Sequence, residues 1–332
     1  MTLPIEKITP DRNNLVKLVR QWGDVNTDGI LDASCQFFTT PDIEGLIGYR
    51  IESGNAVIFG DPVCATKDQS QLAQAFQQFC LEQALGIVYI IASEAFSQRA
   101  SHDPSTVLIE FGVTFTLNPC HNPINLTGSK SALLRKKLRH AAHEGITFTE
   151  YITEDKSVEI ALEKISTAWQ KERQGPQIFL THPTLFNDRI GKRWFYALQS
   201  GEIIGFLILN ELKRYHGWLL NNVMLNKDAA NGVSELLVIS TLQVLEKEGC
   251  QSVTIGPVPR KKLGEIRGLS RFSALITQGI YHLSKTFFNL GGHELFWEKF
   301  QPTRQASYLL FPNNNLSFKS IKAIMRALNA QT

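Results

Sequence analysis

The sequence predicts an α/β chain of the α+β type, built from two tandem lobes with mixed, mostly antiparallel sheets. The chain has 332 residues, and single hydrophobic cores stop growing at roughly 250–300 residues. Its composition, 43% hydrophobic and 20% charged, is that of ordinary globular proteins. Strand-like and helix-like patterns follow a similar order in both halves, without a close sequence repeat. We therefore expect a first lobe at residues 1–126, a connecting helix at 127–145, and a second lobe with the active site at 146–332.

In the first half, the residues Thr9-Pro10-Asp11 are typical of a helix start, and apolar spacing predicts a helix through Trp22. Short runs rich in β-branched and aromatic residues predict strands at 36–40, 45–51 and 56–60, with a hairpin turn at 53–55. Helical spacing follows at 69–85. Continuous apolar runs then predict strands at 86–93 and 107–117.

The second half repeats this alternation. A strand is expected at 146–152, a helix at 158–169, and a hairpin from strands 194–198 and 203–209. A strand at 217–225 precedes a strongly apolar helix at 234–248. A short strand at 252–256 should close at Pro257 and Pro259, because proline cannot donate to a sheet. The pattern ends with a helix at 272–288 and a strand around 308–311.

Charge, cysteine content and hydropathy exclude several classes of protein. The net charge is +3, so binding to nucleic acid or an anionic membrane would need a local cluster of cations. Five scattered cysteines without a Cys-x-x-Cys pair argue against a zinc site and fit a reducing compartment. The longest apolar runs have eight residues, whereas a membrane-spanning helix needs about 20. We expect a cytoplasmic chain, free or peripheral at the inner face of the membrane, with no transmembrane segment.

The segment 127–145 is expected to form a basic helix, capped by Thr127 or Ser131 and ended by Gly145. One acid, Glu144, stands in this segment against a run of cations. These cations are Lys130, Arg135, Lys136, Lys137 and Arg139. Dense like charge on a short helix is unfavourable unless an anion offsets it, and the phosphates of tRNA or of a phospholipid head group would do so. A solvated helix face between two lobes fits the same pattern.

A second basic run, Arg260, Lys261 and Lys262, follows the two prolines and is expected on an exposed loop beside a strand end. It adds to the case for anion binding.

A loop with the pair Asn231-Gly232 separates the strand at 217–225 from the helix that follows it. A helix N-terminus exposes unpaired amides that suit a phosphate or a developing oxyanion, and glycine lets the backbone approach a ligand closely. A simple Asn-Gly turn with Ser234 as a helix cap explains the same residues.

Several segments together resemble the C-terminal domain family of phosphatidylglycerol lysyltransferase, also called aminoacyl-phosphatidylglycerol synthase. They occur in the order of the family and cover roughly residues 40–312. The matching segments are Phe59-Gly-Asp-Pro-Val63, the basic helix from Leu134 to Gly145, Asp228-Ala-Ala-Asn-Gly232, Ile255-Gly-Pro-Val-Pro259, and Lys299-Phe-Gln-Pro302 followed by Tyr308-Leu309.

The resemblance implies two acetyltransferase-like (GNAT) lobes and transfer of an aminoacyl group from aminoacyl-tRNA to a phospholipid such as phosphatidylglycerol. It implies no cofactor. Coenzyme A is the weaker expectation, because the glycine-rich pyrophosphate loop of its users is missing. The chain departs from the family at five positions. Asn221 and Met224 stand where the family often has aspartate and arginine, Trp297 replaces a lysine, and Arg304 and Ser307 replace tryptophan and arginine. These departures put the choice of amino acid and acceptor in doubt.

Within this resemblance, Lys299 is the candidate to neutralise a phosphate or oxyanion, with Asn221 and Glu235 as candidates to position the aminoacyl group. Asn231, Gly232, Arg135, Lys136, Lys137, Arg139, Arg260 and Lys261 are the candidate substrate-binding residues. The histidines show no metal-ligand spacing, so no metal is expected.

Two other functions stay open. The chain could be an acyl-coenzyme A-dependent N-acyltransferase, or a lipid- or tRNA-binding relative with a degenerate site, because fold alone does not determine chemistry.

Overall fold

The computed structural model of the chain describes residues 11–172, 185–260, 262–288 and 292–328. The helices are α1 (Arg12–Trp22), α2 (Gln69–Glu82), α3 (Glu94–Ala100), α4 (Ser129–His143), α5 (Lys156–Glu172), α6 (Val233–Lys247), α7 (Arg271–Phe288), α8 (Gly292–Glu298) and α9 (Phe318–Ala327). The strands are β1 (Gln36–Thr40), β2 (Ile43–Glu52), β3 (Asn55–Phe59), β4 (Val63–Cys64), β5 (Gly86–Ser93), β6 (Val107–Leu117), β7 (Thr147–Tyr151), β8 (Lys192–Gln199), β9 (Glu202–Leu212), β10 (Gly217–Leu225), β11 (Ser252–Pro259), β12 (Ile266–Arg267) and β13 (Thr303–Phe311).

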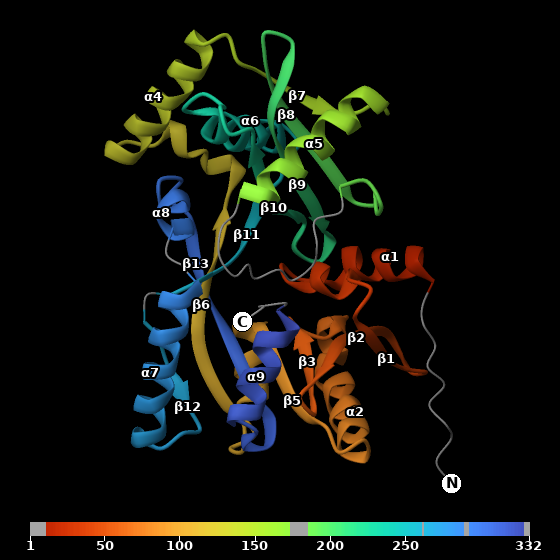
Figure 1. The fold of residues 1–332 in the computed structure, drawn as a ribbon. Helices are drawn as coiled ribbons and strands as arrows, with labels where there is room; N and C mark the ends of the chain where they lie inside the picture. Colours follow the sequence, from red (N-terminus) through yellow and green to blue (C-terminus); the bar gives the residue numbers. More distant parts are fainter. Residues whose placement is uncertain (1–10, 173–184, 261, 289–291, 329–332) are drawn as a thin grey trace.

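The α+β class and the mostly antiparallel sheet are confirmed. Within the described residues, a single mixed sheet runs in the order β1-β2-β3-β5-β13-β6-β11-β10-β9-β8-β7 (Figure 1). Two pairs are parallel, β3 with β5 and β10 with β11. Each parallel pair is joined by a helix, α2 in the first half and α6 in the second, as parallel strands require a crossover. Each half therefore contains a parallel strand–helix–strand unit.

The centre of the sheet is built from exchanged strands. The strand β6 comes from the first half but pairs with β11 of the second half. The strand β13 lies near the end of the chain but pairs with β5 of the first half, and with β6. The halves are thus joined through continuous hydrogen bonding. The division into segments at residues 126 and 145 stays a prediction.

Helices cover both faces of the sheet, and the alternation of side chains along each strand explains how. In β3, Val57 packs with α1 and α9 on one face, while the next residue, Ile58, packs with α2 on the other. In the second half, α4 and α6 share a core with Phe195 and Leu220, and α5 covers Phe206 on the opposite face. Each sheet face is thereby removed from water.

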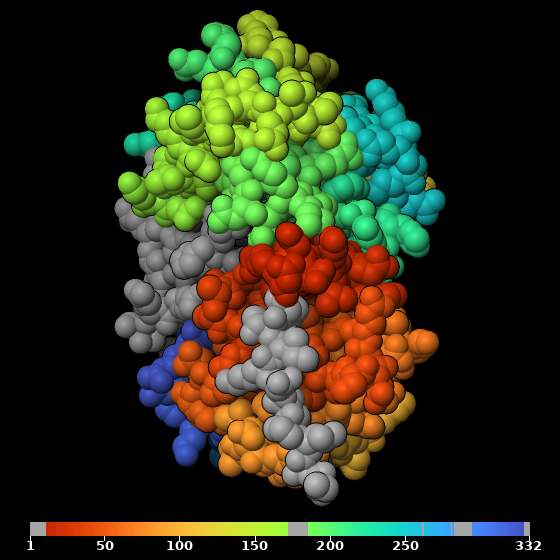
Figure 2. Space-filling view, turned by 90° about the vertical axis from the view of Figure 1, so that its right-hand side faces the viewer, coloured from red at the N-terminus to blue at the C-terminus, as the bar shows by residue number. Residues whose placement is uncertain are grey.

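The helix α1 lies across the boundary between the two ends of the molecule. Figure 2 shows its red surface between the orange first half and the green second half. Arg12 Nε donates to Asp188 Oδ1 at 3.0 Å, and the fully buried Arg20 pairs with Asp28 at 2.5 Å. Arg20 Nε also donates to the carbonyl of Ile190 at 3.1 Å. The contacts with Asp188 and Ile190 tie the N-terminal helix to the second half.

Two sequence expectations need correction, and three of the described helices were not predicted. The strand β11 does not end before the prolines but continues to Pro259. Its pairing with β6 is irregular between Ile255 and Val258, and such an irregularity tolerates a proline, which has no amide donor. The helix α4 has Gly128 as its N-cap with no side-chain cap bond, so neither Thr127 nor Ser131 caps it. Helices α3, α8 and α9 were not expected from the sequence pattern.

Candidate active site at the start of helix α6

The loop after β10 turns sharply into α6 at Gly232. This glycine has φ +106° and serves as the N-cap of the helix, with no side-chain cap bond. The first amides of α6 are therefore not satisfied by a capping side chain, and the positive end of the helix dipole lies here. Glu235 stands in the first turn of α6, 6% exposed, where a carboxylate is favoured by that dipole.

Lys299 reaches Glu235 from the other end of the second half. It follows directly after α8, and its Nζ lies 2.5 Å from Glu235 Oε1. Both side chains are largely buried, with 16% and 7% exposed for Lys299 and Glu235. The Nζ atom also lies 3.9 Å from the ring centroid of Phe296, which favours the cation further. The structure thus brings two of the predicted catalytic residues together.

The basic helix α4 packs directly on this loop. Lys137 Nζ donates to Asn231 Oδ1, and a Cβ added at Gly232 would meet the carbonyl oxygen of Lys137 at 2.6 Å. The backbone of α4 therefore approaches Gly232 closely, and the role of Gly232 in substrate binding stays a prediction. At its other end, α4 is held by Gln301 Nε2, which donates to the buried Ser131 Oγ at 2.9 Å. The C-terminal motif and the α6 loop together clamp α4.

Asn221 lies at an irregularity in β10. The parallel pairing with β11 ends at Leu220 and Ile255, and the register of β10 against β9 shifts between Leu220 and Asn222. Asn221 is exposed there and accepts a hydrogen bond from Asn222 Nδ2 at 3.1 Å. No hydrogen bond or ion pair in the described part of the chain joins it to Lys299 or Glu235.

The predicted anion-binding cations divide into two kinds. Arg135 donates to the carbonyls of Ile124 and Leu126 at 2.7 and 3.0 Å, so it holds α4 against the preceding turn. Lys136 and Arg139 are exposed on α4, and no hydrogen bond or ion pair among the described residues engages either one. They remain available to an external anion.

Arg260 does not join this group. Its guanidinium pairs with Glu110 on β6, and the chain then runs to β12 and α7, at the opposite end of Figure 1 from α4. Lys261 lies outside the described residues. The second basic run is therefore a separate feature of the molecule.

The residues that depart from the family pattern are mostly in the core. Met224 is fully buried beside α5, and Trp297 is 5% exposed in the core around α6. Ser307 is 2% exposed and shares a hydrogen bond of 2.8 Å with Thr114 Oγ1. The exceptions are the exposed Asn221 and Arg304, which is partly exposed and pairs with Glu298 and Glu294.

A second polar cluster, not expected from the sequence, lies at the matching place in the first half. Asp61 of the Phe59–Val63 segment accepts from the Ser93 amide at 2.9 Å and from its hydroxyl at 2.7 Å. The neighbouring Asp24 accepts from the amides of Asn26 and Asp61 at 2.8 and 3.1 Å. Burial, with the adjacent Asp61 carboxylate, raises the pKa of Asp24 to about 7. Burial also raises the pKa of Asp61.

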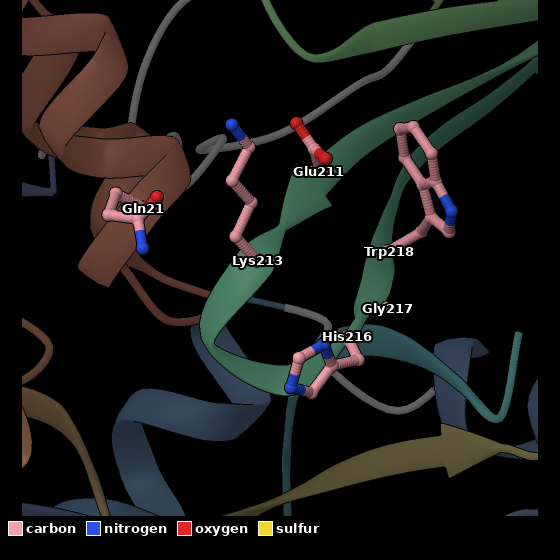
Figure 3. A pocket seen from close by; sticks show the side chains of 6 residues that line it. All are labelled: Gln21, Glu211, Lys213, His216, Gly217 and Trp218. Carbon is pink, nitrogen blue, oxygen red and sulfur yellow. The ribbon is translucent and has the colours of Figure 1, made fainter.

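A pocket of ≈ 360 Å³ opens between α1 and the β9–β10 connection (Figure 3). It is lined by Gln21, Glu211, Lys213, His216, Gly217 and Trp218. None of the predicted site residues lines it.

Among the described residues, no cluster of three histidine, cysteine or acidic side chains could hold a metal ion. No helix of the described chain has the length and apolar character needed to span a membrane.

Comparison with known proteins places the chain in a family. Residues 30–311 match the family described as "Phosphatidylglycerol lysyltransferase, C-terminal". A phosphatidylglycerol lysyltransferase of Bacillus subtilis (strain 168) is 24% identical over 295 residues, which cover 84% of this chain and 32% of that protein. The chain therefore spans about a third of the length of this relative.

Two solved structures share the fold. The structure of L-PGS from Bacillus licheniformis superposes with a TM-score of 0.75 at 18% identity, covering 97% of this chain and 98% of that one. The C-terminal domain of a putative lysylphosphatidylglycerol synthetase from Agrobacterium fabrum also gives a TM-score of 0.75 at 18% identity, covering 96% and 95%. With the family match over residues 30–311, which confirms the resemblance read from the sequence motifs, the chain belongs to the phosphatidylglycerol lysyltransferase C-terminal family.

Proposed function

We propose that this chain transfers an aminoacyl group from aminoacyl-tRNA to a hydroxyl of an anionic phospholipid such as phosphatidylglycerol. The observation that carries the proposal is the buried Lys299–Glu235 pair at the start of α6, in a member of a family named for a lipid-modifying transferase. A relative of the same family is itself called a phosphatidylglycerol lysyltransferase.

The reaction needs little from the protein beyond alignment and charge stabilisation. The acceptor hydroxyl attacks the ester carbonyl carbon of the charged tRNA, and a new carbon–oxygen bond forms to the lipid. The bond to the ribose oxygen breaks, and the proton of the acceptor hydroxyl ends on that ribose oxygen. Because the ester is already activated, orientation and an oxyanion partner supply most of the rate.

Lys299 is suited to stabilise the oxyanion. An ammonium group has three donors, and the pair with Glu235 uses one of them. Burial of the side chain strengthens its interaction with a developing negative charge, because the local dielectric is low. The uncapped amides at the start of α6 add positive potential on the same side.

Glu235 fixes the position of this ammonium group. Its Oε1 contacts Lys299, which leaves Oε2 to accept from the α-ammonium of the aminoacyl group. A carboxylate in this position would favour an aminoacyl donor over a neutral acyl group. That preference separates the proposal from a coenzyme A-dependent reaction.

Lys136 and Arg139 supply the tRNA contact in this proposal. They are exposed on α4, and α4 is clamped to the loop that carries Asn231. A phosphate backbone bound on α4 would therefore bring an acceptor end towards the start of α6. Such binding should weaken steeply with salt.

Lipid extracts test the proposal in cells. Cells that carry the gene, cells without it and cells with Lys299→Ala are compared for aminoacylated lipid by mass spectrometry. The proposal expects the modified lipid in the first extract alone. Equal lipid profiles in all three, from cells that contain the protein, contradict it. A rise in melting temperature with coenzyme A thioesters, but not with charged tRNA, would favour the N-acyltransferase instead.

A further inference from the structure

The helix α7 presents an apolar face to solvent. Phe272, Leu275 and Ile276 are 73%, 66% and 49% exposed. With the exposed Gly279 they follow the spacing i, i+3, i+4 and i+7, so they share one side of the helix. Single exposed apolar residues are normal, but a contiguous row on one helix marks an interaction surface.

The opposite side of α7 carries small and polar residues and faces the protein. Ser273, Ala274 and Thr277 are partly buried. Tyr281 anchors this side, because its hydroxyl donates to the carbonyl of Phe111 at 3.0 Å or that of Arg260 at 2.9 Å. The helix is therefore held by polar contacts, with its apolar face turned outward, the reverse of an ordinary surface helix.

Exposed cations stand on α7 and on the segment that leads to it. Between residues 260 and 288 the sequence has six lysines and arginines and one acid, Glu265. Lys262 and Arg271 are exposed, and Arg267 takes up the single acid at 2.7 Å. An apolar row bordered by cations is the pattern of helices that lie at the surface of an anionic membrane.

We propose that α7 docks this protein on the surface of a bilayer that contains anionic phospholipid. Its axis lies parallel to the membrane, Phe272, Leu275 and Ile276 enter the boundary between head groups and acyl chains, and Arg271 contacts lipid phosphates. The docking itself does not depend on the proposed function, but its biological role does: docking would bring a lipid acceptor to the enzyme. Figure 1 shows α7 and α4 at opposite ends of the molecule, so a membrane at α7 leaves α4 accessible to tRNA.

Charge complementarity favours a bilayer over a second copy of the chain. Two α7 faces packed against each other would place Arg271 of both copies beside the same apolar contact. Like charges at such a contact oppose association, whereas anionic lipids neutralise them.

Vesicle sedimentation tests the docking surface. The full chain is mixed with phosphatidylcholine vesicles, either pure or with phosphatidylglycerol added as the anionic lipid. The double variant Phe272→Ser/Leu275→Ser should bind the anionic vesicles about tenfold more weakly than the wild type. The matched control is Ile152→Ser/Ile160→Ser, two residues 84% and 64% exposed at the β7–α5 end of the molecule. This control should bind as the wild type does.

Two results would overturn the docking proposal. One is equal vesicle binding by the wild type and the α7 variant, with both folded by circular dichroism. The other is a dimer of the wild type in solution that the α7 variant converts to a monomer, which would assign this face to a second copy. Added salt should weaken wild-type vesicle binding, because part of the attraction is electrostatic.

Transfer to lipid in vesicles, compared with transfer to dissolved lipid, distinguishes a failure of the docking proposal from a failure of the proposed function. On vesicle phosphatidylglycerol, the α7 variant should lose most of the transfer. On a short-chain phosphatidylglycerol dissolved as monomers, it should keep wild-type transfer. Vesicle binding without any transfer by the wild type contradicts the proposed function but not the docking. Equal transfer by variant and wild type on both acceptors contradicts the docking alone.

Discussion

The Nζ atom of Lys299 lies 2.5 Å from Oε1 of Glu235, and the two residues come from segments 64 positions apart. A buried ion pair is weak support for stability, because desolvation offsets much of the attraction. Its position beside the start of α6 instead suits chemistry on a substrate that develops negative charge. This relationship is the centre of the proposed site.

Lys299→Ala should reduce aminoacyl transfer by about 10²-fold or more, because removing one oxyanion donor costs roughly that much. Lys299→Arg should restore only part of the rate, since the guanidinium fork has a different shape from an ammonium group. The measurement is transfer rate at saturating lipid. Lys164→Ala, on the exposed face of α5, is the control and should keep the wild-type rate. Wild-type transfer by Lys299→Ala would remove Lys299 from the chemistry.

Gly232→Ala should lower the free energy of unfolding by about 2–4 kcal/mol, because strain at positive φ adds to a clash. The new Cβ would meet the Lys137 carbonyl at 2.6 Å, which pushes α4 away from the loop. Gly201→Ala is the matched control, since Gly201 has φ +84° but no neighbour within 4 Å. That variant should lose only about 1–2 kcal/mol. Equal losses in urea unfolding would show that the approach of α4 does not require glycine.

Lys136→Ala/Arg139→Ala should weaken tRNA binding and reduce the slope of log K against log salt by about 1–2, because two phosphate contacts disappear. The free energy of unfolding should stay unchanged, since both side chains are exposed and form no hydrogen bond or ion pair within the described chain. Arg135→Ala should differ by also lowering the melting temperature, because Arg135 holds the carbonyls of Ile124 and Leu126. An unchanged salt slope in the double variant would place the tRNA elsewhere.

Asp24 should make the protein less stable as pH rises towards neutrality. Burial beside Asp61 raises the pKa of Asp24 from 3.8 to about 7, so in this range the folded state binds a proton that the unfolded state releases. The stabilisation is fully present below pH 3.8 and is lost as pH rises through about 7. Asp24→Asn should flatten the decline in unfolding free energy between pH 5 and 8. A decline as steep as in the wild type would mean that Asp24 does not titrate there.

Much of the fold could be predicted because local patterns carry it. The runs that form β1, β5, β6 and β10 have the bounds that the sequence predicted, and the two-residue turn after β2 adopts positive φ at Ser53 and Gly54. Helices without a clear signal were missed. The helix α3 begins directly after β5 and is capped by Ser93, the last residue of the strand. The helix α9 uses Ser317 and Ser320 in place of the usual serine–glutamate capping box.

Candidate site residues could be named from the sequence, but their arrangement could not. Lys299, Asn231 and Gly232 were candidates from motifs and Glu235 was a candidate from its place early in a helix. Their contacts depend on how α8 and α4 pack against α6. Phe296, under the Lys299 ammonium group, gave no signal beyond being an apolar residue. Arg260 was grouped with the α4 cations by charge alone, whereas the structure pairs it with Glu110. Sequence shows charge, but only tertiary packing decides which charge has a partner.

Transfer of a labelled amino acid tests the central claim most directly. The full chain is incubated with labelled aminoacyl-tRNA and vesicles that contain phosphatidylglycerol, and the label in the organic phase is counted over time. The account predicts labelled lipid with the wild type, a loss of about 10²-fold with Lys299→Ala, and no change with Lys164→Ala. Label that stays on tRNA with folded wild-type protein, across tRNAs charged with each amino acid, would contradict it.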